Sequence, residues 1–210
     1  MANATGAFGL RPVRHINGSS WNGATIKCYV SSNYATALFV GDPVILNQVA
    51  ANQHASSKYF SVAKSGGADA TAVFGVITSI VPNSSDLTQK HIPASTGGYV
   101  NVCIDPTVVY QIRDDGGLTP TTSNFIGLNG VIDVTGTGST YTGLSACELD
   151  TDDPPAADQS NPLFVMGLAD LPDNEFAINA VWDVIISNHF WARSGAAANE
   201  GIILGLAMTS

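Results

Sequence analysis

Short runs in which apolar and polar residues alternate dominate the first half of the chain and return near its end. Residues 25–30 show the pattern clearly, because Ile26, Cys28 and Val30 fall on one face of an extended segment. Asn, Gly, Pro and Ser bound these runs, which is typical of turns between antiparallel strands. The sequence therefore predicts an all-β protein.

Other segments have the same pattern. Further strands are predicted at residues 36–40, 43–47, 59–63, 72–80, 98–104, 107–113, 163–168 and 176–190. Asp105 and Pro106 separate two of them and predict either a tight corner or a bent continuous strand. The segment 176–190 is the longest, so we expect it to be the central strand. The apolar stretch 202–206 is expected to pack on this domain or on another chain, and its neighbouring alanines also permit a helix.

These segments predict a single all-β domain, built as a β-barrel or as a β-tulip or sandwich of short antiparallel strands with long surface loops. The length of 210 residues fits one core better than two. We expect residues 1–24 to form an extended N-terminal arm and residues 25–210 to form the β domain. The stretch from about 114 to 160 is rich in acidic and turn residues and predicts a loop-rich insertion.

Composition adds information about partners. Charged residues make up only 12% of the chain, a share that suits permanent contacts because uncharged polar groups are cheaper to bury than unpaired charges. The net charge of −9 argues against nucleic acid as a partner. Seven of the eight basic residues precede Asp114, whereas thirteen of the seventeen acidic residues lie from Asp114 onward. This asymmetry indicates either a polarised interaction surface or simple repulsion that favours solubility.

Cysteine usage and hydropathy indicate where the protein is made. Cys28, Cys103 and Cys147 are far apart and show no CxxC spacing, which favours reduced, buried thiols over a disulfide framework or a zinc site. The N-terminus lacks a basic-then-apolar leader, and no apolar run approaches the roughly 18 residues of a membrane span. We therefore expect synthesis in the cytoplasm and no membrane partner.

Candidate catalytic and metal-binding motifs are weak. The acidic residues after Cys147 lack the spacing of an EF-hand, so a solvated loop is favoured over a cation site. They are Glu148, Asp150, Asp152, Asp153 and Asp158. Asp114 and Asp115 precede two glycines and are better explained as turn residues than as paired catalytic acids. The histidines lie in separate segments, at His15, His54, His91 and His189. The sequence predicts no catalytic residue, cofactor or bound metal.

The chain also contains a serine motif. Residues 143–147, Gly-Leu-Ser-Ala-Cys, have a partial likeness to the nucleophile elbow of hydrolases. They lack the closing glycine and the strand-turn-helix context that expose such a serine, so we expect no nucleophile at Ser145.

The order of several segments resembles a family of phage proteins. The opening GLRPVRHINGSSWNGATIKCYVSSNYATALFVGDPVIL is similar to the start of small proteins encoded beside the major capsid protein of tailed phages. Later segments follow the style of the same family: GVITSIV, YVNVCIDPTVVYQIRDDG, FIGLNG, a serine before ELD, PLFVMGLADLPDN and VWDVIISNHF. The resemblance covers nearly the whole chain and suggests a head decoration or capsid cement protein.

The resemblance implies a function and partners. It implies a β-barrel or β-tulip module, often trimeric, that bridges major capsid protein subunits at three-fold or quasi-three-fold positions on the outside of an expanded shell. We expect a homotrimer, with a dimer as the alternative, and no enzymatic activity. The expected capsid contacts lie in the N-terminal arm, at Phe8, Leu10, Arg11, Arg14 and Trp21. The competing hypothesis is a host-attachment or glycan-binding fibre or tail module, in which an exposed aromatic such as Tyr141 stacks on sugars.

Overall fold

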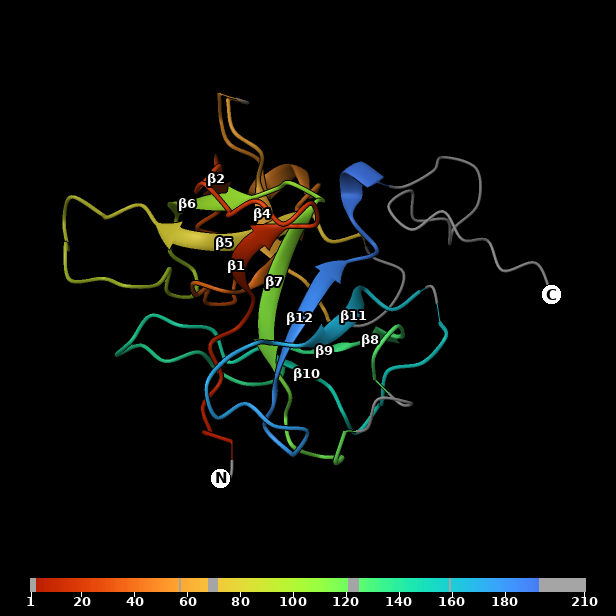
Figure 1. Ribbon diagram of the computed structural model, residues 1–210. Helices are drawn as coiled ribbons and strands as arrows, with labels where there is room; N and C mark the ends of the chain where they lie inside the picture. Colours follow the sequence, from red (N-terminus) through yellow and green to blue (C-terminus); the bar gives the residue numbers. More distant parts are fainter. Residues whose placement is uncertain (1–2, 57, 68–71, 121–124, 159, 193–210) are drawn as a thin grey trace.

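The computed structural model describes residues 3–56, 58–67, 72–120, 125–158 and 160–192. Within these residues the protein is a β-sandwich of two five-stranded antiparallel sheets and a small hairpin, without an α-helix or a closed barrel (Figure 1). The predicted all-β class is confirmed, and the sandwich is the architecture adopted. The apolar stretch 202–206 lies outside the described residues.

The first sheet has the strand order β1-β7-β12-β11-β8. Its strands are β1 (Arg11–His15), β7 (Val108–Arg113), β12 (Val181–Ile186), β11 (Leu163–Leu168) and β8 (Asn129–Gly130). The hairpin of β9 (Ile132–Asp133) and β10 (Glu148–Leu149) lies beside this sheet. The expected central strand is confirmed, because β12 has two strands on either side.

The second sheet has the strand order β2-β6-β5-β3-β4. Its strands are β2 (Ile26–Val30), β6 (Gly98–Cys103), β5 (Gly75–Ile80), β3 (Pro43–Leu46) and β4 (Val62–Lys64). The Tyr29 N–H donates to the Phe60 carbonyl at 2.8 Å, so the segment before β4 returns to β2 at the opposite edge. The sheet is therefore strongly curved, and its two edge strands approach each other.

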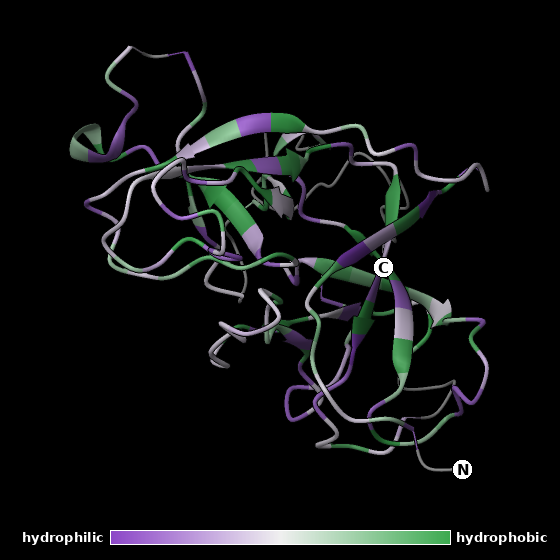
Figure 2. Cartoon of the chain, turned by 90° about the vertical axis from the view of Figure 1, so that its left-hand side faces the viewer, coloured by the Kyte–Doolittle hydropathy of each residue, from purple (hydrophilic) through white to green (hydrophobic). Residues whose placement is uncertain are grey.

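Buried apolar side chains form two clusters, and hydrophobic residues concentrate in the strands of both sheets (Figure 2). The first cluster lies against the first sheet and includes Tyr110, Trp182 and Leu149. Val76 and Cys103, a paired position on β5 and β6 of the second sheet, also belong to it. The second cluster fills the curve of the second sheet around Phe74. Because Val76 and Cys103 of the second sheet pack in the cluster of the first sheet, the two sheets form one body.

Most predicted strands are found, with shifted ends. The corner at Asp105 resolves the alternative left open there, because β6 and β7 belong to different sheets. Asp105 accepts hydrogen bonds from the N–H and hydroxyl of Thr107 at 2.8 and 2.7 Å, which stabilises the turn. The segment 36–40 is not a strand and makes only single bridges, at Leu38 and Val40. The strand expected at 59–63 is β4, which begins at Val62.

The predicted strand 176–190 is too long. β12 begins at Val181, because Asn179 has a φ of 62° and turns the chain just before it. Phe176 and Ile178 are 43% and 46% exposed, although strict alternation along an extended segment would place them on the same face as the buried Trp182. At the other end, η2 (Phe190–Ala192) is a single turn of 3-10 helix. Alternation predicted the buried part of this segment correctly and its flanks wrongly.

The N-terminal segment differs from the predicted extended arm. Residues 11–15 form the edge strand β1, which pairs with β7. Leu10 is buried, and its N–H donates to the Gly41 carbonyl at 2.9 Å. Gly9 and Gly41 both have positive φ, and a Cβ on Gly41 would lie 2.5 Å from the Phe8 carbonyl oxygen. Two glycines in contact thus let this segment pack closely on its own domain.

Candidate functional site

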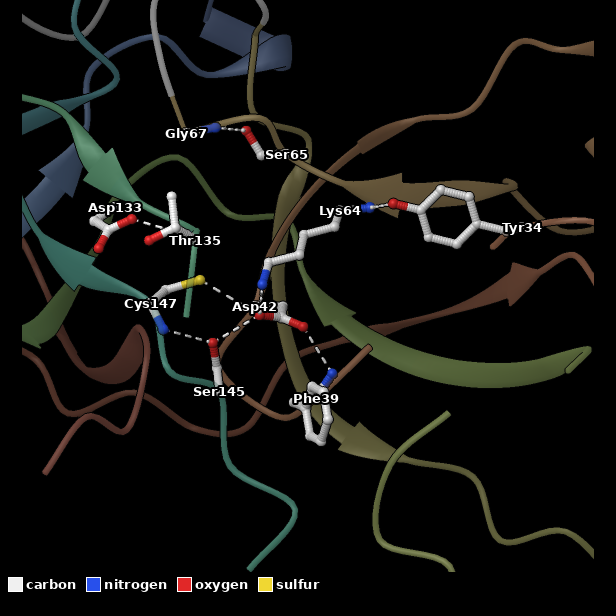
Figure 3. Close-up of polar contacts among 10 residues, drawn as sticks. All are labelled: Tyr34, Phe39, Asp42, Lys64, Ser65, Gly67, Asp133, Thr135, Ser145 and Cys147. Carbon is white, nitrogen blue, oxygen red and sulfur yellow. Dashed lines mark hydrogen bonds and ion pairs between the residues drawn. The ribbon is translucent and has the colours of Figure 1, made fainter. Parts of the chain in front are cut away.

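A cluster of buried polar side chains joins the second sheet to the segment before β10 (Figure 3). Asp42 is fully buried, and its Oδ1 accepts a hydrogen bond from the Ser145 hydroxyl at 2.6 Å. The same oxygen lies 3.3 Å from Lys64 Nζ and 3.4 Å from Cys147 Sγ. Asp42 Oδ2 accepts the Phe39 N–H at 2.7 Å, so both carboxylate oxygens have partners.

This cluster has the residue types of a nucleophilic site but not their required states. Burial and the nearby Asp42 raise the pKa of Cys147 to about 12, so it stays a thiol. Burial acts to lower the pKa of Lys64, but the adjacent Asp42 carboxylate outweighs it and leaves that pKa raised, so the amine stays charged and cannot act as a base. Ser145 is 1% exposed. We interpret the cluster as a structural link between the two parts of the chain.

The five residues expected to contact a capsid lie in different environments. Leu10 is in the core, and Trp21 is half-buried against it. Arg14 forms an ion pair with Asp183 at 2.9 Å. Arg11 donates to Gln111 at 2.6 Å and lies over the half-buried ring of Phe8, with 4.9 Å between Cζ and the ring centre. Leu10 is not available at the surface, whereas Phe8 and Arg11 lie at the edge of the first sheet; capsid contact by any of them stays a prediction.

Where the structure describes them, the acidic and histidine residues do not converge on a metal site. Among the described residues, no group of three or more His, Cys, Asp or Glu side chains has a metal-binding arrangement. Burial and the neighbouring Asp115 raise the pKa of Glu148, against the opposing effect of Arg113. The four histidines have different contacts. His15 contacts Asp105, His54 contacts Tyr99, His91 stacks on Phe39, and His189 is buried after β12.

An exposed aromatic patch lies where the two sheets meet. Phe60, Phe190 and Trp191 are 48%, 37% and 51% exposed, and each contacts the buried ring of Phe74. We call these three residues the aromatic patch. A hollow of about 410 Å³ adjoins Trp191 and is lined by Ile26, Ile104 and Pro106 among others. Large rings that remain exposed side by side are typical of protein contact surfaces.

A groove of about 500 Å³ lies near the patch, between β2 and the segments that follow β3 and precede β4. Its apolar lining includes Ile26, Leu46 and Phe60, and its polar lining includes Lys27, Lys58, Gln48, Gln53 and Tyr59. Sequence reasoning missed this groove, because its residues come from three separate segments. The one local signal was the triplet Lys58-Tyr59-Phe60, in which a cation adjoins two aromatic rings.

Tyr141, the aromatic residue expected to stack on sugars, is 82% exposed and lies away from both hollows. Lys90 Nζ lies 5.2 Å from its ring centre and donates to its carbonyl at 2.8 Å. The groove, with Tyr59, offers a better enclosed surface for a ligand.

Comparison of the chain with protein-family models, curated proteins and solved structures finds no match. In the part of the chain that is described, no helix is long and apolar enough to cross a membrane.

Proposed function

We propose that this chain is a non-enzymatic structural protein of a tailed-phage particle that binds the major capsid protein and reinforces the shell from outside. The aromatic patch is the observation that carries the proposal. Three partly exposed rings around Phe74 offer an apolar anchor of the kind that dominates the energetics of protein interfaces. Few charges would need to lose their hydration there.

The sequence supports the same proposal. Its segments resemble head decoration and cement proteins along most of the chain, and its low share of charged residues suits a permanent interface. Ala24, the last residue of the predicted arm, and Thr25, the residue that follows it, line the hollow beside Trp191. The proposed contact surface therefore centres on the aromatic patch and this hollow, with Phe8 and Arg11 as secondary contacts.

The proposed mechanism is preferential binding to one state of the shell. A module that bridges several subunits only when the shell is expanded stabilises that state by its differential binding free energy. Attachment at three-fold or quasi-three-fold positions as a homotrimer, with no cofactor, is part of the proposal. The buried hydrogen bonds at Asp42 suit this role, because they join two parts of a protein that would bridge several subunits.

The first test is the number of copies of this chain relative to the major capsid protein in purified particles, measured by quantitative mass spectrometry. A near-stoichiometric ratio is expected. A handful of copies would contradict a cement role and indicate a fibre or tail protein, and absence from particles would reopen an enzymatic function.

The second test concerns the surface. Particles lacking the chain are incubated with purified protein carrying Trp191→Ala, which removes a half-exposed ring from the aromatic patch. Loss of an aromatic hot spot typically costs about 2 kcal/mol or more, so occupancy at limiting concentration should fall about thirtyfold. Tyr141→Ala, which removes an exposed ring elsewhere, is the matched control. Equal occupancy for the two variants would exclude the patch as the contact surface.

A further inference from the structure

We propose that the groove lined by Lys27, Lys58 and Tyr59 is a binding site for an acidic carbohydrate, such as a sugar chain that ends in a sialic or uronic acid. This site goes beyond capsid binding and does not depend on it. Its lining combines a cation, an aromatic face and amide side chains, which are the groups that an acidic sugar would use.

Charge selects the class of ligand. Two of the eight basic residues of the chain line this groove, and none of the acidic residues that the structure describes does. The ion pairs between side chains in the described part of the chain involve Arg14, His15 and Lys64, so neither groove lysine is neutralised by one. The protein as a whole has a net charge of −9, so the charge of the groove lining is opposite in sign to that of the chain. The groove therefore favours an anion.

Two aromatic rings hold the ammonium group of Lys27 in place. Its Nζ lies 4.3 Å from the ring centre of Tyr99 and 5.5 Å from that of Tyr59. Aromatic faces attract a cation but do not neutralise it, so the ammonium group can still bind a carboxylate. His54 donates to or accepts from the Tyr99 hydroxyl at 3.1 Å and contacts the Tyr59 ring edge-on, which fixes the platform beneath Lys27.

The remaining lining matches a sugar better than a bare anion. The half-buried ring of Tyr59 and the apolar side chains of Ile26 and Leu46 can pack against the C–H face of a pyranose. Gln48 is exposed and offers an amide that both donates and accepts hydrogen bonds to hydroxyl groups. A volume of about 500 Å³ lies within the range of small-ligand sites.

Hydrogen bonds to backbone carbonyls join the walls of the groove. Asn47 N–H donates to the Ser61 carbonyl at 2.8 Å, and Tyr29 N–H donates to the Phe60 carbonyl at 2.8 Å. The side-chain amide of Gln53 donates to the Asn47 carbonyl. Because these bonds join the walls to each other, binding need not order the walls, which preserves affinity.

Isothermal titration calorimetry with the full chain tests the proposal. The probes are 3′-sialyllactose and trigalacturonic acid, with lactose and the methyl ester of trigalacturonic acid as uncharged counterparts. At least one acidic probe is expected to bind, and its counterpart about tenfold more weakly or not at all, since a hydrogen bond to a charged group contributes about 1.5–3 kcal/mol. Lys27→Gln and Tyr59→Ala should each weaken binding of that probe about tenfold.

Lys90→Gln and Tyr141→Ala provide matched controls, because they alter a lysine-tyrosine contact on another surface. Circular dichroism verifies that each variant is folded, and Tyr59→Phe, which keeps the ring, should retain binding. The proposal is overturned if neither acidic probe binds, if neutral counterparts bind equally well, or if the control variants weaken binding as much as Lys27→Gln. Binding of polyglutamate without sugar binding would also overturn it and would identify the groove as a site for an acidic protein. None of these outcomes depends on the copy number in particles.

Discussion

His189 is a titratable side chain that the fold holds in its neutral form. It is fully buried just after β12, where its Nδ1 accepts the Trp191 N–H at 3.1 Å. Burial lowers its pKa from 6.5 to about 4, against a smaller opposing effect of Asp105. Nε2 has no hydrogen-bond partner among the described residues. Protonation would therefore place a charge in an apolar site beside the aromatic patch.

The expected result is acid sensitivity. Because the pKa of His189 is lower in the folded state than in the unfolded state, the native protein binds fewer protons than the unfolded chain as the pH falls. The contribution of neutral His189 to the free energy of unfolding is therefore fully present above pH 6.5. The free energy of unfolding should fall by on the order of 3 kcal/mol as the pH decreases to about 4. Urea unfolding of the wild type and of His189→Gln across this range measures the difference in slope.

NMR titration of the histidine ring protons provides an independent check. His189 should titrate well below the other histidines if burial controls it. A midpoint near 6.5, or an equal pH slope in His189→Gln, would contradict this account.

At the scale of elements, alternation predicted strands correctly where every second side chain of the segment is buried. β2 and β11 have nearly the predicted bounds, because Cys28, Val30, Leu163 and Val165 all face a core. Alternation failed at Phe176 and Ile178, where the chain turns at Asn179 before β12 begins. The turn depends on Asp114, which is 65 positions from Asn179 in the sequence. No local pattern can predict such a contact.

The candidate site was less predictable than the fold for the same reason. Tyr59 and Lys27 meet only because the second sheet curves until the segment before β4 reaches β2. The aromatic patch likewise joins Phe60 to Phe190 through Phe74. Composition indicated a polar, low-charge surface, but the position of each ring depended on tertiary contacts.

Asp114 should therefore be essential for the start of β12. Its fully buried carboxylate accepts the backbone N–H groups of Asn179, Ala180 and Gly116 at 2.6, 3.0 and 3.1 Å. It also accepts the Trp182 indole N–H at 2.9 Å. Asp114→Ala leaves four donors without this partner and should destabilise the protein by about 3 kcal/mol or more, measured by urea unfolding.

Asp86→Ala is the control for this prediction. Asp86 also accepts hydrogen bonds in a turn, from Thr88, but it is exposed, so water replaces the lost contacts and the unfolding midpoint should not change. Asp114→Asn keeps the shape of the side chain and should fall between the wild type and Asp114→Ala. Equal midpoints for Asp114→Ala and Asp86→Ala would show that the carboxylate does not stabilise the turn.

At the scale of the whole molecule, the two proposed surfaces are neighbours with different physics. Phe60 belongs to both the aromatic patch and the groove, and Ile26 lines both the groove and the hollow beside Trp191. The patch would bind by burial of apolar area, which salt affects little. The groove would bind through two exposed lysines, whose attraction for an anion is screened by salt.

Ionic strength should therefore separate the two activities. Raising NaCl from about 0.05 to about 0.5 M shortens the Debye length well below 10 Å, so the affinity for the acidic sugar should fall severalfold while occupancy on particles stays nearly constant. Trp191→Ala should reduce particle occupancy and leave sugar affinity unchanged, and Lys27→Gln should do the reverse. A different result would be a fall of sugar affinity and particle occupancy together with salt, with each of the two variants impairing both kinds of binding. The patch and the groove would then be one surface with one partner. That partner would have to be acidic, because the salt-sensitive contacts come from Lys27 and Lys58.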